Sequence, residues 1–168
     1  MIQHIKFRKM TEDEYIRWEE WENTNYIQEL MEARQISECE ARAQIEKEHS
    51  ECSLPIDNLF VSENNDGTPV GVIWYVVQDA NRIFILNFVV YEEHRRMGYG
   101  SAILAELECR AKSEGFSIIN FHVFEHNKAA IELYKKCGYK IVQDTGNGGM
   151  YMEKHFCDTL CHVIPRAP

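Results

Sequence analysis

A glycine-containing segment beside two arginines is the clearest candidate for a chemical site in this sequence. Arg95-Arg96-Met97-Gly98-Tyr99-Gly100-Ser101 follows an apolar run and precedes apolar residues at helical spacing, so a helix is expected to begin at the glycines. Glycines let a ligand approach the backbone, and the free N–H groups of a first helical turn attract an anion. Arginines add charge-assisted hydrogen bonds. The segment therefore predicts a phosphate or pyrophosphate site.

Two common phosphate-binding loops fit this segment poorly. A dinucleotide-binding fingerprint needs a third glycine, but Ile103 stands at that position, and Tyr91–His94 separates the glycines from the preceding apolar run. A P-loop is excluded because no Lys-Ser or Lys-Thr follows the glycines. A nucleotide-binding protein of another fold is therefore the less favoured alternative.

A second segment completes a recognisable pair of motifs. Asn127-Lys128-Ala129-Ala130-Ile131-Glu132-Leu133-Tyr134 follows a predicted strand and is itself followed by Gly138-Tyr139. Together the two segments resemble the GCN5-related N-acetyltransferase (GNAT) family, which carries Gln/Arg-x-x-Gly-x-Gly/Ala after an apolar strand and then Asn-x-x-Ala-x-x-x-Tyr on a helix. Arg95, Gly98 and Gly100 match the first motif residue by residue.

The resemblance covers about Lys6 to Phe156 and implies a fold. The fold class is α/β (mixed α+β), with a twisted, mostly antiparallel sheet of about seven strands flanked by about four helices. The fourth and fifth strands of such a sheet are parallel and splayed apart. We expect residues 1–156 to form a single acetyltransferase domain and assign no role to the tail of residues 157–168.

The same resemblance implies that acetyl-CoA is the cosubstrate. The glycine segment would grip its pyrophosphate, and the pantetheine arm would pair with the backbone of the fourth strand, where an N–H near Val89 would hold the oxyanion. From the residues alone, plain core packing for the strand and a helix N-cap for Asn127 remain open. The implied cofactor-binding residues are Phe88, Val89, Val90, Arg95, Arg96, Met97, Gly98, Tyr99, Gly100, Ser101, Asn127 and Tyr134.

Tyr134 is the candidate for the general acid. It stands seven residues after Asn127, almost two helical turns, so the two side chains share one face of the helix. The resemblance places this hydroxyl beside the thioester sulfur. Its ordinary pKa near 10 keeps it protonated at neutral pH, ready to donate to the departing thiolate. An isolated tyrosine in this pattern would otherwise be a core residue.

The general base is predicted to be His122, in the fifth strand. Branches of the family that acetylate protein N-termini often carry a glutamate here, and an imidazole with a pKa near 6.5 can serve as a base at neutral pH. A buried structural histidine is the equal alternative. Asn87 stands where some similar sequences carry an aspartate, but an amide cannot act as a base. His126 is interpreted as a surface or capping residue.

The elements that position these residues can be read from capping and turn signals. Capping boxes at Thr11–Glu14 and Ser37–Glu40 predict two helices, the first with a break near Asn23–Asn25 and the second through about His49. Helices are also predicted over 98–114, ending at a left-handed Gly115, and over 127–136. The predicted strands are 4–10, 59–61, 70–77, 83–90, 116–124, 139–143 and 150–156.

Length and charge limit the class of protein. The chain has 168 residues, enough for one core, and a formal charge of −9, which argues against a general nucleic-acid binder. Acids outnumber bases by about three to one over 11–51; this suits a cationic substrate, although a solvated helical face explains most of it. No apolar run has membrane length, and the N-terminus does not resemble a signal peptide, so we expect a cytoplasmic protein without a membrane partner.

The cysteines predict neither disulfides nor a metal site. All six are scattered and read as reduced thiols in a chain without a secretion signal. Cys157-x-x-x-Cys161-His162 is a half-site without a partner pair, whereas structural zinc needs four ligands. We therefore expect no metal.

These observations predict an enzyme, an acetyl-CoA-dependent N-acetyltransferase. It would move an acetyl group to a primary amine, either a small cationic amine or a peptide or protein amine, by direct attack through a tetrahedral intermediate. A non-catalytic acyl-CoA-binding or regulatory domain of the same fold is the alternative. The sequence does not identify the acceptor or the oligomeric state, and a dimer is compatible with it.

Overall fold

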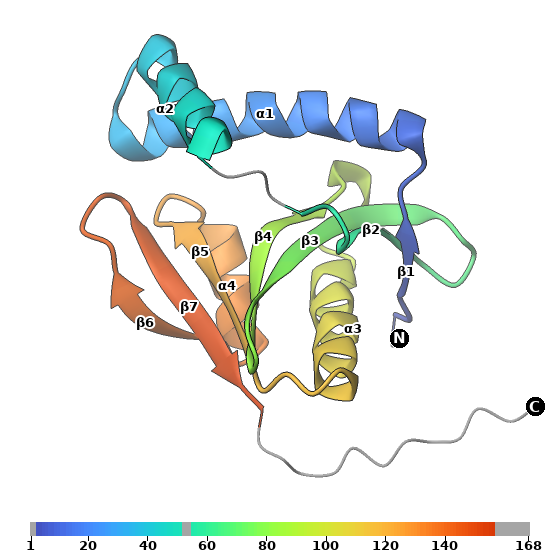
Figure 1. The fold of residues 1–168 in the computed structure, drawn as a ribbon. Helices are drawn as coiled ribbons and strands as arrows, with labels where there is room; N and C mark the ends of the chain where they lie inside the picture. The colour runs from blue at the N-terminus through green and yellow to red at the C-terminus, as the bar shows by residue number, and fades with distance from the viewer. Residues whose placement is uncertain (1–2, 52–54, 157–168) are drawn as a thin grey trace, which may run out of the picture.

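A seven-stranded sheet with the order β1-β2-β3-β4-β5-β7-β6 is the framework of the molecule (Figure 1). The structure is a computed structural model that describes residues 3–51 and 55–156. β4 and β5 form the parallel pair, and the other neighbours are antiparallel, which confirms the predicted fold class. The strands are β1 (Lys6–Lys9), β2 (Leu59–Glu63), β3 (Pro69–Asp79), β4 (Arg82–Val90), β5 (Ile118–Phe124), β6 (Lys140–Asp144) and β7 (Gly149–His155).

Helices cover both faces of the sheet. They are α1 (Glu12–Arg34), α2 (Glu38–Glu51), α3 (Tyr99–Ser113) and α4 (Lys128–Lys136), with a short 3-10 turn η1 (Glu92–His94) before α3. The main core joins one sheet face to α3 and α4, and its fully buried side chains include Ile83, Leu104 and Ile119. A smaller cluster lies beneath α1 and α2, where Leu30 and Phe124 meet. None of the helices among the described residues is long and apolar enough to cross a membrane.

α1 is one continuous helix, and the predicted break near Asn23–Asn25 is wrong. Its capping box is confirmed: Glu14 N donates to Thr11 Oγ1 at 3.3 Å, and Thr11 N donates to Glu14 Oε2 at 2.9 Å. The Thr24 hydroxyl donates to the Glu20 carbonyl at 3.0 Å, so it does not compete for the helix N–H groups. Packing of the helix against the sheet then outweighs the weak helix propensity of these polar residues.

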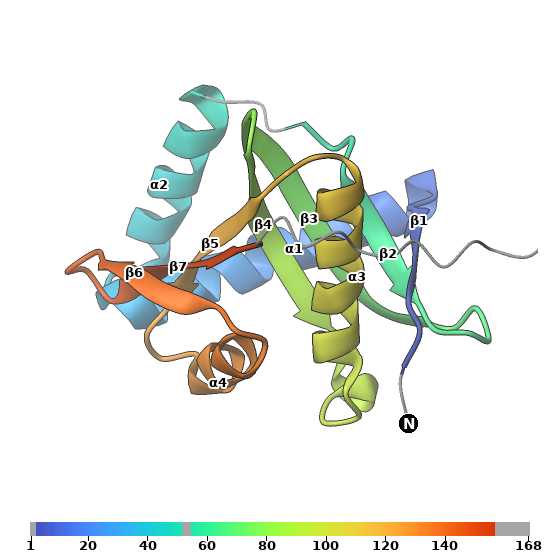
Figure 2. The same cartoon turned by 90° about the horizontal axis from the view of Figure 1, so that it is seen from below.

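β4 and β5 separate halfway along their length. Their register runs only from Arg82–Ile118 to Ile85–Phe121, after which β4 stays paired with β3 and β5 with β7. The β3–β4 register shifts so that Leu86 is an extra residue, a β-bulge that bends the strand. Figure 2 shows β4 and β5 diverging from each other along their length. Among the described residues no strand pairs with the second half of β4 on the β5 side, so the predicted splay is present.

Candidate functional site

The glycine segment forms a helix N-terminus with free donors. Arg96 and Gly98 have φ of 63° and 87°, and this left-handed backbone turns the chain into α3. The first backbone bond of the helix runs from Ala102 N to Gly98 O at 3.2 Å. The N–H groups of Tyr99, Gly100 and Ser101 consequently have no partner within the helix, which is the arrangement that binds an anion.

Glycine is favoured at position 98 and at position 100 for different physical reasons. A Cβ at Gly98 would meet no atom within 4 Å, so this position opens outward, and its left-handed backbone is what favours glycine. A Cβ at Gly100 would lie 2.8 Å from Leu133 Cδ2, because α3 and α4 approach each other there. A side chain at Gly98 would therefore point into open space beside the loop, whereas one at Gly100 would press on Leu133 of α4.

The remaining side chains of the segment divide into exposed and buried ones. Arg95, Arg96 and Met97 are exposed, and Arg95 Nε donates to the Val90 carbonyl at 3.1 Å. This bond holds the guanidinium against the end of β4. Tyr99 is buried in the main core, so only its backbone N–H faces the loop.

The open half of β4 presents backbone groups between the diverging strands. Tyr91 N donates to Val70 O in β3 at 3.0 Å, and antiparallel strands alternate, so the N–H groups of Asn87 and Val89 point the same way. Those of Phe88 and Val90 point toward the open edge. The sequence predicts an oxyanion donor near Val89, and the N–H groups next to Val89 that face the open edge are those of Phe88 and Val90.

The side chains of this stretch lie on both faces of the sheet. Phe88 and Val90 pack against the main core, which confirms their interpretation as packing residues. Val89 lines a cavity of about 560 Å³ on the α1 side. Its neighbour Asn87 is also directed to that side, where its amide hydrogen-bonds the Glu22 carboxyl group of α1.

Tyr134 lies on the α3–α4 side of the sheet. Its ring is buried against Phe121, with centroids 4.2 Å apart, and is 6.1 Å from Phe88 of the open strand. Burial, and then the charge of Glu29, raise the pKa of the Tyr134 hydroxyl, which keeps it protonated. Asn127 Oδ1 accepts from Ala130 N at 3.2 Å, which confirms the helix-cap interpretation of this residue.

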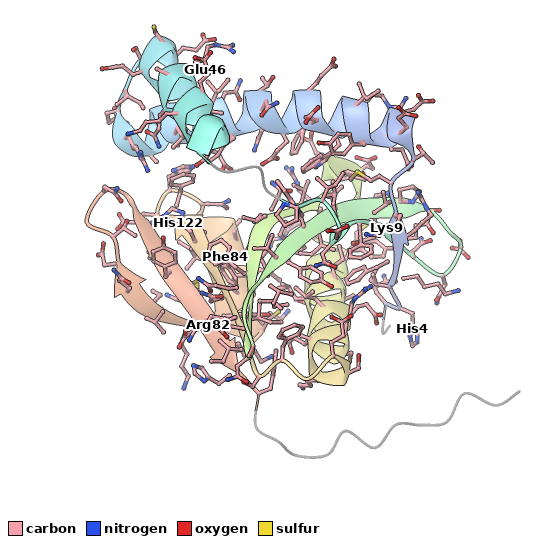
Figure 3. All side chains as sticks on the ribbon, viewed as in Figure 1. His4, Lys9, Glu46, Arg82, Phe84 and His122 are labelled. Atoms are coloured by element: carbon pink, nitrogen blue, oxygen red, sulfur yellow. The ribbon has the colours of Figure 1, made fainter. Side chains whose placement is uncertain are left out.

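His122 lies on the opposite face of β5 from Phe121 and Tyr134. Figure 3 shows it on the side that faces α1 and α2. Its ring is 5.0 Å from the Phe124 ring and 5.4 Å from the Tyr151 ring of β7. Burial, and then the charge of Arg34, lower its pKa, so the imidazole is neutral at pH 7. The structure thus places the two predicted catalytic residues on opposite sides of the sheet.

Two acids of α1 are less exposed than the sequence predicts. Glu22 and Glu29 are partly buried toward the sheet, although the acids of this helix read as a solvated face. Burial, and then the charge of Glu29, raise the pKa of Glu22 to about 7, although the Asn87 hydrogen bond opposes this. Burial also raises the pKa of Glu29. Their spacing from Trp18 and Asn25 is helical, and this periodicity was the available signal.

His126 is also more enclosed than the sequence indicated. Its ring stacks on Phe124 at 5.6 Å, and its Nε2 lies 3.8 Å from Glu32 Oε2 of α1. Within residues 3–51 and 55–156, no group of three or more His, Cys, Asp or Glu side chains is arranged to hold a metal ion. Cys157, Cys161 and His162, the half-site weighed above, lie outside the described residues, as does the rest of the tail.

Known proteins resemble this chain in sequence. The model of the acetyltransferase (GNAT) family matches residues 14–139. The uncharacterized N-acetyltransferase YycN of Bacillus subtilis is 33% identical over 89 residues, 51% of this chain and 57% of YycN. YdgE of the same organism, also an uncharacterized N-acetyltransferase, is 31% identical over 97 residues, 56% of this chain and 58% of YdgE. The chain thus spans less than two thirds of the length of these curated relatives.

Solved structures resemble it in fold. The crystal structure of Bacillus subtilis YycN has a TM-score of 0.74 at 24% identity, covering 83% of this chain and 94% of that one. Spermidine N-acetyltransferase from Vibrio cholerae, in complex with CoA and spermine, has a TM-score of 0.60 at 15% identity, covering 90% and 95%. With the glycine loop, the diverging strands and the matched residues 14–139 in agreement, the chain belongs to the GNAT acetyltransferase family.

Proposed function

We propose that this protein transfers an acetyl group from acetyl-CoA to a primary amine by direct attack through a tetrahedral intermediate. The observation that carries the proposal is the open edge of β4, which ends beside the free N–H groups of α3. GNAT proteins use acetyl-CoA, a molecule with a pyrophosphate and an extended arm that contains two amides. The helix N-terminus suits the first, and an unpaired strand edge suits the second.

The residues of the loop and strand would hold the carrier by charge and backbone hydrogen bonds. Arg95 and Arg96 lie exposed beside the N–H groups of Tyr99, Gly100 and Ser101, where they would neutralise the pyrophosphate. The N–H groups of Phe88 and Val90 would donate to the arm or to the oxyanion. Met97 belongs to the glycine segment and Asn127 caps α4, and both would also contact the carrier.

Proton transfer requires groups on both sides of the sheet. Tyr134, on the α4 side, would donate to the thiolate as the C–S bond breaks. Its raised pKa makes full ionisation unfavourable, so the hydroxyl would recover a proton from the attacking nitrogen in the same step. A base on the α1 side would deprotonate the incoming amine, and His122 is the residue that the sequence predicts for this role.

An assay of CoA release separates catalysis from simple binding. Purified protein is given acetyl-CoA and a panel of amines that includes spermidine, arylalkylamines and short peptides, and free thiol is measured while calorimetry records acetyl-CoA affinity. We expect micromolar-range binding and CoA release that depends on one class of amine. Binding without release for any amine would favour the non-catalytic alternative, and absence of binding would contradict the assignment of the loop.

A further inference from the structure

Glu22 and Asn87 form a pair that joins the middle of α1 to the open half of β4. The Asn87 amide hydrogen-bonds the Glu22 carboxyl group, yet Glu22 Oε2 and Asn87 Oδ1 are both buried without a partner within the described part of the chain. Both of these atoms are hydrogen-bond acceptors. Buried acceptors are costly to leave unpaired, so the pair suits a ligand that brings N–H donors.

A cavity of about 560 Å³ lies between α1 and the sheet, and chain neighbours of Glu22 and Asn87 line it, although the pair itself does not. Trp18 stands one helical turn before Glu22, and Val89 stands two residues after Asn87 on the same strand face, and both line the cavity. Trp21 and Val72 add further apolar surface, and Glu92 and Glu93 are also in the lining. The cavity thus combines an apolar lining with acidic side chains, and residues close in sequence to Glu22 and Asn87 form part of that lining.

We infer that the acceptor is a primary amine carrying an apolar group, which occupies this cavity and gives its first proton to Glu22 while Asn87 Oδ1 holds a second N–H. The inference rests on the proposed acetyl transfer. The ammonium loses one proton to the Glu22 carboxylate, and the neutral nitrogen attacks the thioester carbonyl. The N–C bond forms, the C–S bond breaks, and a second nitrogen proton passes by way of Tyr134 to the thiolate. Glu22 returns its proton to solvent, and the third proton stays on the amide.

The positions of Glu22 and His122 explain why Glu22 is the better placed base. Glu22 is joined through Asn87 to the strand whose edge is open. His122 pairs in register with Tyr151 of β7, and a Cβ at Gly149 would lie 2.1 Å from its Nε2, so the imidazole abuts the backbone of β7. The charge that acts on it is that of Arg34, at the far end of α1. His122 therefore lies toward β7 and not toward the open edge of β4.

A matched pair of α1 variants tests this role. Glu22→Gln removes the carboxylate and keeps the shape, whereas Glu20→Gln removes the same charge from the exposed side of the helix. We expect Glu22→Gln to lower kcat by about a hundredfold or more, with unchanged acetyl-CoA affinity, and to remove the low-pH limb of the pH–rate profile. Glu20→Gln should behave as wild type. The charged groups around the pair are Glu29 on α1 and, in the cavity lining, Glu14, Arg17, Glu92, Glu93 and Arg95.

A binding measurement keeps the inference testable if no amine is acetylated. The indole N–H signals of Trp18 and Trp21 are followed by NMR while phenethylamine, or a short peptide beginning with phenylalanine, is added. We expect both signals to shift in wild type and in Glu20→Gln, and to shift at several-fold higher amine concentration in Glu22→Gln. The two probes distinguish a small amine from a peptide amine.

The outcomes separate the inference from the proposed function. Wild-type turnover that survives Glu22→Gln but is lost in His122→Ala would overturn the role of Glu22 and leave acetyl transfer intact. If neither probe shifts the indole signals of the wild-type protein, the assignment of this cavity to the acceptor would be overturned. Shifted indole signals without CoA release would retain the amine site and contradict the acetyltransferase function.

Discussion

The Tyr134 hydroxyl is the proposed donor of a proton to the departing thiolate. Tyr134→Phe removes one hydroxyl and keeps the ring that packs on Phe121, so the fold should not change. We predict that kcat falls by about a hundredfold or more while acetyl-CoA affinity stays the same, because only the proton donor is lost. Steady-state CoA release and calorimetry measure the two quantities. A near-normal kcat would mean that water protonates the thiolate and that α4 only positions the carrier.

Glu22 also makes the stability of the protein depend on pH. Its pKa is about 7 in the folded chain, against 4.5 for the ordinary carboxyl group. Since the folded pKa is raised, the stability that its neutral form contributes is present below pH 4.5 and is lost as pH rises through 7. We predict that Glu22→Gln matches wild type near pH 4 and is more stable by about 2–3 kcal/mol at pH 8. Urea unfolding at both pH values measures this, and an equal difference at the two would contradict it.

Single residues could be assigned from the sequence only where a motif fixes their surroundings. Gly98 and Tyr134 stand at motif positions, so their places beside the loop and on α4 could be anticipated. The contact of Glu22 with Asn87 could not be anticipated, because more than sixty residues of sequence separate the two and the burial of Glu22 depends on how α1 lies on the sheet. An acid on a helix rich in acids gives no local sign of burial.

A glycine stands at each end of α3, and only the one at its N-terminus lies in the proposed pyrophosphate site. Gly98 and Gly115 both have left-handed φ, 87° and 90°, and a Cβ at either would meet no atom within 4 Å. Alanine at either position should therefore lower the free energy of unfolding by a similar amount, about 1–2 kcal/mol. We predict that only Gly98→Ala weakens acetyl-CoA binding, since Gly115 lies at the other end of the helix. Equal acetyl-CoA affinities of the two variants in calorimetry would remove the loop from the binding site.

Most elements were predictable because their ends carry local signals. Both capping boxes, the left-handed glycine after α3 and the apolar run of β4 place these elements correctly. β1 and β5 are shorter than predicted, since strand ends depend on the partner strand. The bulge at Leu86 had no local signal, because it is a mismatch between β3 and β4. Because β4 separates from β5 at this bulge, the geometry of the site depends on how the strands pair and not on any one segment of sequence.

The negative charge of the whole molecule should favour the association of a positively charged acceptor. The chain carries a formal charge of −9, and the cavity lining includes the acids Glu14, Glu92 and Glu93. We predict that kcat/KM for an apolar primary amine that carries a second positive charge falls several-fold between low and physiological ionic strength. A monoamine should show a smaller fall under the same conditions. A salt dependence that is flat for both amines would show that steering by charge plays no part.

The divergence of β4 from β5 gives the sheet an edge in its interior. Exposed edges ordinarily invite association with other chains, and proteins protect them. This edge is enclosed by Glu22 and Asn87 on one side and by Phe88 and Tyr134 on the other, so it favours a narrow chain of atoms over a second polypeptide. Amide protons of Phe88 and Val90 should therefore exchange with deuterium faster than those of Asn87 and Val89. Acetyl-CoA should slow that exchange, acting as an additional strand of the protein's own sheet.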